Sequence, residues 1–135
     1  MAFPRSKKEL KLVFNHMENT CEQLFKSFSN EAKKASAEFL LNPKKLDSNF
    51  TNWQVDLNVD LEKLKELDPD FFNEIKGKIH SFEQSAKRLI KVYKNKPKEN
   101  TGTTQLEYFK NLQDAEDELK SVLGIIFQTI KNISF

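Results

Sequence analysis

The chain has 135 residues, 31% of them charged, and contains only three glycines and four prolines. This length suits one domain of residues 1–135, and the composition is typical of a helical protein and argues against a β-sandwich or a disordered tail. A net charge of +2 is too small to indicate nucleic-acid binding by itself. The single Cys21 excludes an internal disulfide, and we find no signal peptide and no transmembrane segment. We therefore expect an intracellular, most simply cytoplasmic, protein.

A long first helix is predicted over about residues 7–41. Apolar residues recur at alternating gaps of three and four from Leu10 to Phe39, which places them on one stripe of an α-helix. Ser6 and Glu9 have the spacing of a capping box at its start, and Asn42-Pro43 is expected to end it.

The next segment has a different pattern. Trp53, Val55, Leu57 and Val59 alternate with polar residues, and a period of two indicates an extended chain with one buried face. We therefore predict an extended connection over 42–59, with Trp53 packed on the protein, followed by a short helix over 61–67.

Two further helices are predicted over about 69–95 and 105–132. Asp68-Pro69 supplies an N-cap and a first-turn proline for one, and Thr104 to Glu107 supplies a second capping box for the other. Three apolar stripes can pack only on one another, so the fold class is all-α, an elongated antiparallel three-helix bundle with coiled-coil-like seams. The predicted core includes Phe14, Leu24, Phe28, Ile79, Phe82, Leu89, Leu112, Leu119, Leu123 and Ile126.

Basic side chains form two clusters far apart in the sequence. In an up-down-up bundle, the start of the first long helix and the end of the second lie at the same pole, so the two clusters are expected to merge. The predicted basic pole consists of Arg5, Lys7, Lys8, Lys11, Lys87, Arg88, Lys91, Lys94, Lys96 and Lys98. Such a pole attracts an acidic protein or an anionic membrane surface. Nucleic acid is the weaker candidate, because Tyr93 is the one aromatic residue among these lysines.

The last helix carries more apolar residues than its stripe requires. Val122, Ile125 and Phe127 lie beside the stripe near its end. Two interpretations stay open: burial between the other helices and the 42–67 segment, or a surface that pairs with another chain, including a second copy.

No pattern indicates chemistry. His16 and His80 lack neighbouring ligands at the spacings that metal sites use, and Cys21 occupies a core-stripe position. Glu116 also sits on a stripe, where we expect a structural polar layer with Arg88 or His16. We therefore expect no cofactor and no enzymatic activity. The favoured function is a protein–protein interaction or scaffold module, and the alternative is binding to anionic surfaces through the basic pole.

Overall fold

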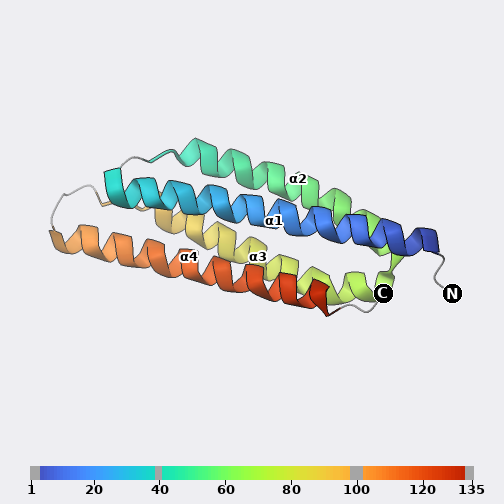
Figure 1. Ribbon diagram of the computed structural model, residues 1–135. Coiled ribbons are helices and arrows are strands. Elements are labelled where there is room, and N and C mark those ends of the chain that lie inside the picture. Colours follow the sequence, from blue (N-terminus) through green and yellow to red (C-terminus); the bar gives the residue numbers. More distant parts are fainter. Residues whose placement is uncertain (1–3, 39–40, 98–101, 133–135) are drawn as a thin grey trace.

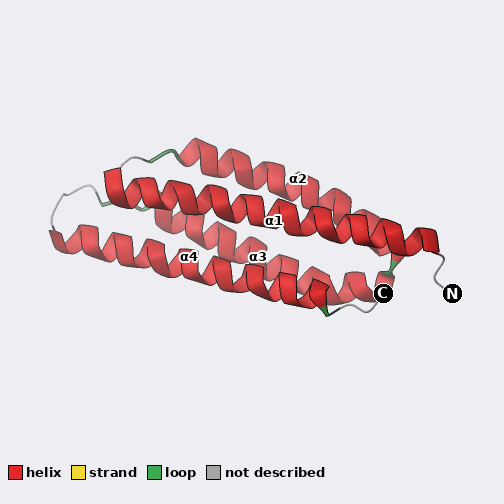
Figure 2. Cartoon of the chain, viewed as in Figure 1, coloured by secondary structure: helices red, strands yellow, loops and turns green. Residues whose placement is uncertain are grey.

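The protein is a bundle of four antiparallel helices, in a computed structural model that describes residues 4–38, 41–97 and 102–132. The helices are α1 (Pro4–Glu38), α2 (Pro43–Leu67), α3 (Pro69–Lys94) and α4 (Gly102–Lys131). Figure 1 shows them running side by side along an elongated molecule, and Figure 2 shows no strand in the part that is described. Contacts join α1 to α2, α2 to α3, α3 to α4 and α4 back to α1, so the four helices form a closed ring around one core.

The predicted three-helix bundle is wrong, because residues 43–67 form one continuous helix in place of an extended connection and a short helix. The side chains that α2 buries are separated by alternating gaps of four and three: Leu46, Phe50, Trp53, Leu57, Asp60 and Leu64. Trp53 and Leu57 are four residues apart and face the core, whereas Val55 and Val59 are on the opposite side. The period-two pattern was therefore the overlap of an inner and an outer helical row.

Helix boundaries follow local capping at two of four starts. The Asn42 side chain accepts a hydrogen bond from the Lys45 backbone N–H at 3.3 Å, with Pro43 in the first turn. Asp68 caps α3 as predicted, since its carboxylate accepts from the Phe71 N–H at 3.1 Å. The two predicted capping boxes are misplaced by two residues or more, because α1 begins at Pro4 and α4 at Gly102.

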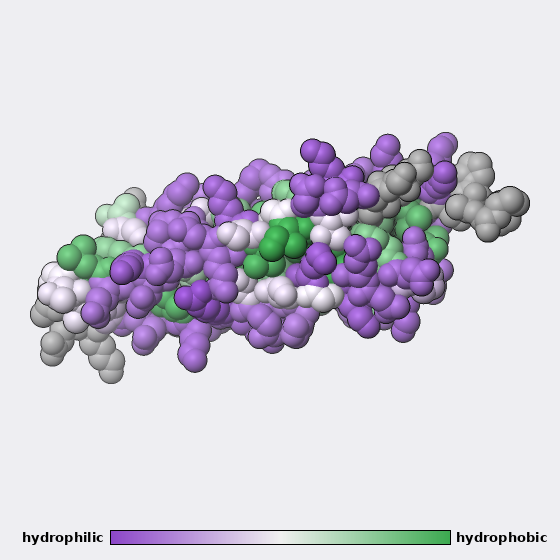
Figure 3. Space-filling model, turned by 90° about the horizontal axis from the view of Figure 1, so that it is seen from below, coloured by the Kyte–Doolittle hydropathy of each residue, from purple (hydrophilic) through white to green (hydrophobic). Residues whose placement is uncertain are grey.

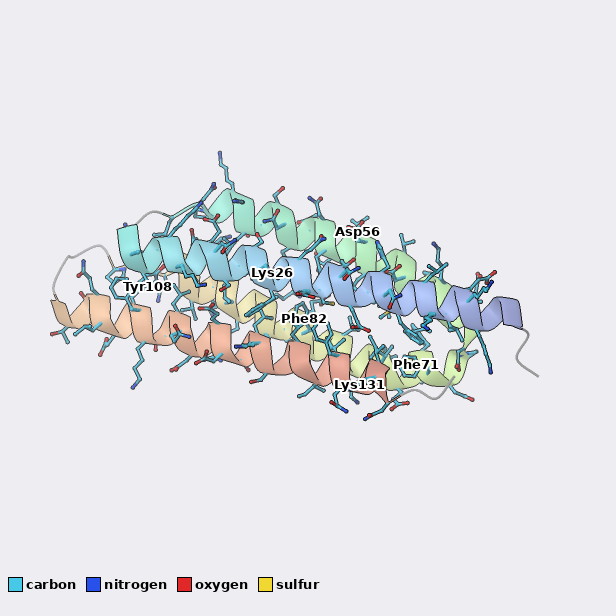
Figure 4. The ribbon with its side chains drawn as sticks, in the orientation of Figure 1. Lys26, Asp56, Phe71, Phe82, Tyr108 and Lys131 are labelled. Atoms are coloured by element: carbon cyan, nitrogen blue, oxygen red, sulfur yellow. The ribbon has the colours of Figure 1, made fainter. Side chains whose placement is uncertain are left out.

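All ten residues predicted for the core are buried, and so is Trp53. The Trp53 ring lies between two phenylalanines, with centroid distances of 5.7 Å to Phe50 and 5.3 Å to Phe82. The labelled Phe82 points into the space between the helices in Figure 4. Aromatic packing of this kind joins α2 to α3, so α2 belongs to the core rather than covering it from outside.

The additional helix, α2, changes which ends of the helices meet. Because α2 runs back along α1, α3 runs parallel to α1, and the end of α3 lies at the opposite pole from the start of α1 (Figure 1). The two basic clusters therefore do not merge. The predicted merger is wrong because the sequence pattern of residues 43–67 was not recognised as a helix.

Candidate interaction surface

The outward surface of α1 and α2 is poor in charge. We use the name α1–α2 face for the outward side of α1 residues 12–27 and α2 residues 48–63. The exposed residues of α1 over 12–23 are Leu12, Asn15, His16, Asn19 and Gln23. The exposed residues of α2 over 48–59 are Ser48, Thr51, Asn52, Val55, Asp56, Asn58 and Val59. Only Asp56 among these twelve residues carries a fixed charge, and the exposed charges Lys26, Glu62 and Lys63 lie toward the ends of the face.

Large apolar side chains are exposed on the same face. Leu12 is 69% exposed, Val55 59% and Val59 51%. In the described part of the chain two other large hydrophobic residues are similarly exposed, and both lie on α4, at positions 106 and 125. Those two are about 28 Å apart along their helix, so they do not form a patch. Exposed apolar groups are thus concentrated on the α1–α2 face.

Two shallow hollows lie along the groove between α1 and α2. One has a volume of about 280 Å³ and is lined by polar side chains, including Thr20, Gln23 and Asn52, with Trp53 among the lining residues. The other has a volume of about 330 Å³ and lies between Leu12 and Val59. Asp56 lines both hollows, and its label in Figure 4 stands on the outer side of α2, away from Phe82. The two hollows are therefore neighbours on this face, one on each side of Asp56.

A buried acid forms part of the second hollow. The Asp60 carboxylate lies 2.6 Å from Nδ1 of His16, whose ring is largely exposed. Burial raises the pKa of Asp60, and the hydrogen bond from His16 opposes that rise. No local pattern in the sequence indicated this pair, because its members lie on two helices of which one was predicted as an extended segment.

The apolar side chains predicted as an interface on α4 are mostly used inside the molecule. Val122 and Phe127 are half-buried and pack against the core. Ile125 is 51% exposed. Two of the three predicted residues are thus partly covered within the bundle, and Ile125 remains on the surface.

The predicted basic pole is divided between the two ends. Lys7, Lys8 and Lys11 are exposed near the start of α1, and the side chain of Arg5 and the whole of Lys98 lie outside the described parts. Lys87 and Arg88 are a turn or more back from the end of α3, where Lys87 pairs with Glu83 and Arg88 pairs with Glu118 of α4. Lys91, Lys94 and Lys96 lie at the end of α3.

A different set of lysines gathers at that end. We use the name basic end for lysines from the end of α1, the start of α2 and the end of α3: Lys33, Lys34, Lys44, Lys45, Lys91, Lys94 and Lys96. Lys94 pairs with Asp47 at 2.8 Å, which links α3 to α2. The buried Glu31 carboxylate lies 3.0 Å from Nζ of Lys45, an ion pair whose angles fall outside those of a hydrogen bond. Sequence reasoning missed the four lysines from α1 and α2, because it placed the turn between these helices away from the end of α3.

Glu116 and Cys21, which the sequence placed on core stripes, both have partners within the bundle. Glu116 accepts a hydrogen bond from the Ser29 hydroxyl at 2.5 Å, so its predicted partners Arg88 and His16 are wrong. Cys21 is fully buried and its Sγ is 3.4 Å from the indole nitrogen of Trp53. Burial raises the pKa of the Cys21 thiol to about 12. The thiol therefore stays protonated at neutral pH and acts as a small core side chain.

Among residues 4–38, 41–97 and 102–132, no group of three or more His, Cys, Asp or Glu is placed to hold a metal ion. Within the same residues, no helix combines the length and the apolar character that crossing a membrane requires. No protein-family model, curated protein or solved structure matches the chain. The surface itself is therefore the basis for any functional inference.

Proposed function

We propose that this protein is a non-enzymatic interaction module that binds another protein chain through the α1–α2 face. The observation that carries the proposal is the coincidence of depleted charge, over residues 12–23 and 48–59 of this face, with Leu12, Val55 and Val59 exposed beside a groove. Charged residues are depleted at the centres of protein–protein interfaces, whereas ordinary helical surfaces are charged. A patch of this kind lowers solubility unless a partner covers it.

The test is photo-crosslinking in the native source. A photoreactive amino acid replaces Val55 on the α1–α2 face, and the matched control replaces Gln84, an exposed residue of α3. We expect protein adducts at position 55 that are lost when Leu12→Asp is added, and none of those adducts at position 84. Identical adducts at both positions, or no adduct at position 55, would contradict the proposal.

A second candidate function, binding to an anionic membrane surface, is favoured by the basic end. Six lysines from three helices and Lys96, just after α3, lie there, and Glu31 and Asp47 beside them are already paired. Such a cluster attracts anionic lipid through a field that salt screens. Lys44 and Lys91 are exposed and have no ion pair with another described residue, which makes them the natural contacts.

This second candidate is tested with vesicles containing anionic lipid, at several salt concentrations, and with neutral vesicles and duplex DNA for comparison. Lys44→Glu with Lys91→Glu should weaken vesicle binding. Lys8→Glu with Lys11→Glu, an equal charge change at the other end, should have a smaller effect. Binding that ignores salt and the first pair of substitutions would exclude the basic end. Equal binding to DNA would show general attraction to polyanions.

A further inference from the structure

We propose that the α1–α2 face binds a second copy of this chain, with α2 lying antiparallel to the partner's α2 across a twofold axis near Val59. This inference rests on the proposed function and deepens it by naming the partner. The feature that identifies the partner is the arrangement of Asp56, Val59 and Lys63 along the outer side of α2.

The apolar part of the face suits contact with itself. Val55 and Val59 are four residues apart on the outer side of α2, and Leu12 of α1 lies across the second hollow from Val59. A twofold axis brings the same patch of both chains together, so a residue near the axis meets its own copy. Val59 meeting the partner's Val59, with Leu12 beside it, would cover the exposed apolar groups of both copies at once.

The charges on this face choose the direction of pairing. Asp56 and Lys63 flank Val59 and are seven residues apart, which is about two helical turns and places them on the same side of α2. Both are exposed, both line the second hollow, and neither forms an ion pair with another described residue. Antiparallel pairing about Val59 places each Asp56 near the partner's Lys63, and it does so twice by symmetry. Parallel pairing would place like charges together, which disfavours it.

Beside the exposed charges Glu62 and Lys26, the remaining side chains of the face include several amides. Asn19, Gln23 and Asn52 are exposed and uncharged, and amide side chains both donate and accept hydrogen bonds, so they can bond to polar groups of either kind on the partner. The stretch of α2 that overlaps its own copy about this axis, residues 52–67, is about 24 Å long, and two helices are about 20 Å wide. It offers an area of roughly 500 Å² per copy, which is at the low end for specific interfaces. We therefore expect a weak dimer that forms in the micromolar range.

Analytical ultracentrifugation over roughly 1 µM to 1 mM tests the arrangement by charge exchange. Asp56→Lys alone and Lys63→Asp alone each place like charges opposite one another, and each should raise the dimer dissociation constant at least about tenfold. In an equimolar mixture, a heterodimer pairs a chain with lysine at both positions with a chain with aspartate at both positions. Both of its contacts between positions 56 and 63 therefore join a lysine to an aspartate. The mixture should therefore regain a dissociation constant close to that of the wild type, and a mixture that associates no better than either variant alone would contradict the arrangement.

The double variant with both Asp56→Lys and Lys63→Asp supplies the rescue, because each contact of its homodimer again joins one lysine to one aspartate. This double variant should dimerise like the wild type. Asp114→Lys on α4 is the matched control, an equal charge change at an exposed residue that should leave the dimer intact. Circular dichroism on each variant checks that the helices are retained.

The outcomes separate this inference from the proposed function. A wild-type chain that is monomeric up to 1 mM overturns the dimer, and so does a double variant that fails to associate when the wild type does. If the chain is monomeric and position 55 still crosslinks to a different protein, the interaction face stands and the second copy is wrong. If position 55 yields no adduct and the chain is monomeric, both proposals fail together.

Discussion

The α1–α2 face and the outer surface of α3 and α4 cover the same core and differ in what they present to solvent. On α3 and α4 the exposed side chains include charged pairs, among them Arg88 with Glu118 between the helices. Figure 3 views the molecule from below, where hydrophilic side chains cover most of the surface and hydrophobic ones occupy small separate areas. On the α1–α2 side, Glu22 pairs with Lys26 within α1, but Asp56 is the one fixed charge among the exposed residues over 12–23 and 48–59. The inner stripe of a helix therefore says nothing about which side chains its outer side presents to solvent.

The largest expected effect separates the inside of α2 from its outside. Leu57→Ala removes a side chain that is 2% exposed, and it should lower the free energy of unfolding by about 2–5 kcal/mol through lost burial and an unfilled cavity. Val55→Ala, two residues away on the outer row, should change it by less than about 0.5 kcal/mol. Urea unfolding followed by circular dichroism measures both. Similar losses of unfolding free energy for the two variants would mean that Leu57 does not face the core and Val55 does not face solvent as described.

A substitution on each surface compares the two candidate interfaces directly. Val59→Asp buries a charge at the proposed twofold axis and should weaken self-association by at least about 2 kcal/mol, or roughly 30-fold. Ile125→Asp on α4 makes the same kind of change at a side chain with the same 51% exposure, and it should leave self-association unchanged. Sedimentation equilibrium measures both constants. The reverse result would move the interface to α4 and restore the interpretation that Val122, Ile125 and Phe127 bind another chain.

A moderate, pH-dependent effect is expected within the groove. Burial raises the pKa of Asp60, so the folded protein holds this proton more tightly than the unfolded chain does. The stability that this group contributes is therefore complete below pH ~4 and declines as the pH rises through the raised pKa. The Asp60→Asn variant has no titrating group at this position. The free energy of unfolding of the wild type minus that of the variant should therefore fall as the pH rises from the acid range.

Removing His16 provides the control for that measurement. Its hydrogen bond opposes the effect of burial on the pKa of Asp60. In a His16→Gln background, loss of the bond should make the decline with pH steeper. If the difference in free energy of unfolding between the wild type and Asp60→Asn grows with rising pH instead, the pairing with His16 outweighs the effect of burial on the pKa of Asp60.

The smallest expected effect belongs to the charged surface of α3 and α4. A double-mutant cycle of Arg88→Ala and Glu118→Ala should give a coupling of about 0.2–1 kcal/mol, because both side chains are largely exposed. The coupling should fall further in about 1 M salt, where screening is strong. Thermal unfolding of the four proteins measures it. A coupling well above this range would make the pair a structural contact rather than a solvated one.

Residues with regular spacing allowed much of the fold to be predicted. The stripes of α1, α3 and α4 and the Asp68 cap were legible because each depends on neighbours within a turn or two of helix. The stripe of α2 was not recognised, since Asp60 occupies one of its buried positions and Val55 and Val59 on its outer row are also apolar. The position of Asp60 in a core row can be explained only when its partner is known, and that partner, His16, lies 44 residues away in the sequence.

One missed helix was enough to misplace the candidate site. The predicted basic pole depended on the direction of residues 69–94, which reverses when a helix is inserted before it. The α1–α2 face could not be foreseen for the same reason, because half of it was assigned to an extended chain. Local pattern determined which residues are inside, whereas the grouping of outward residues from different helices depended on the number of helices.

The order of the helices around the ring also bears on how the chain folds. Each helix packs against the one that precedes it in sequence, and Asp68 is the single residue between α2 and α3. Of the four pairings around the ring, that of α4 with α1 brings together distant parts of the chain. Bundles whose contacts are this local fold in microseconds to milliseconds, because little loop-closure entropy is lost before contacts form. We infer that successive hairpins assemble first and that the ring closes when α4 reaches α1, so Ser29 and Glu116 meet in the last step of folding.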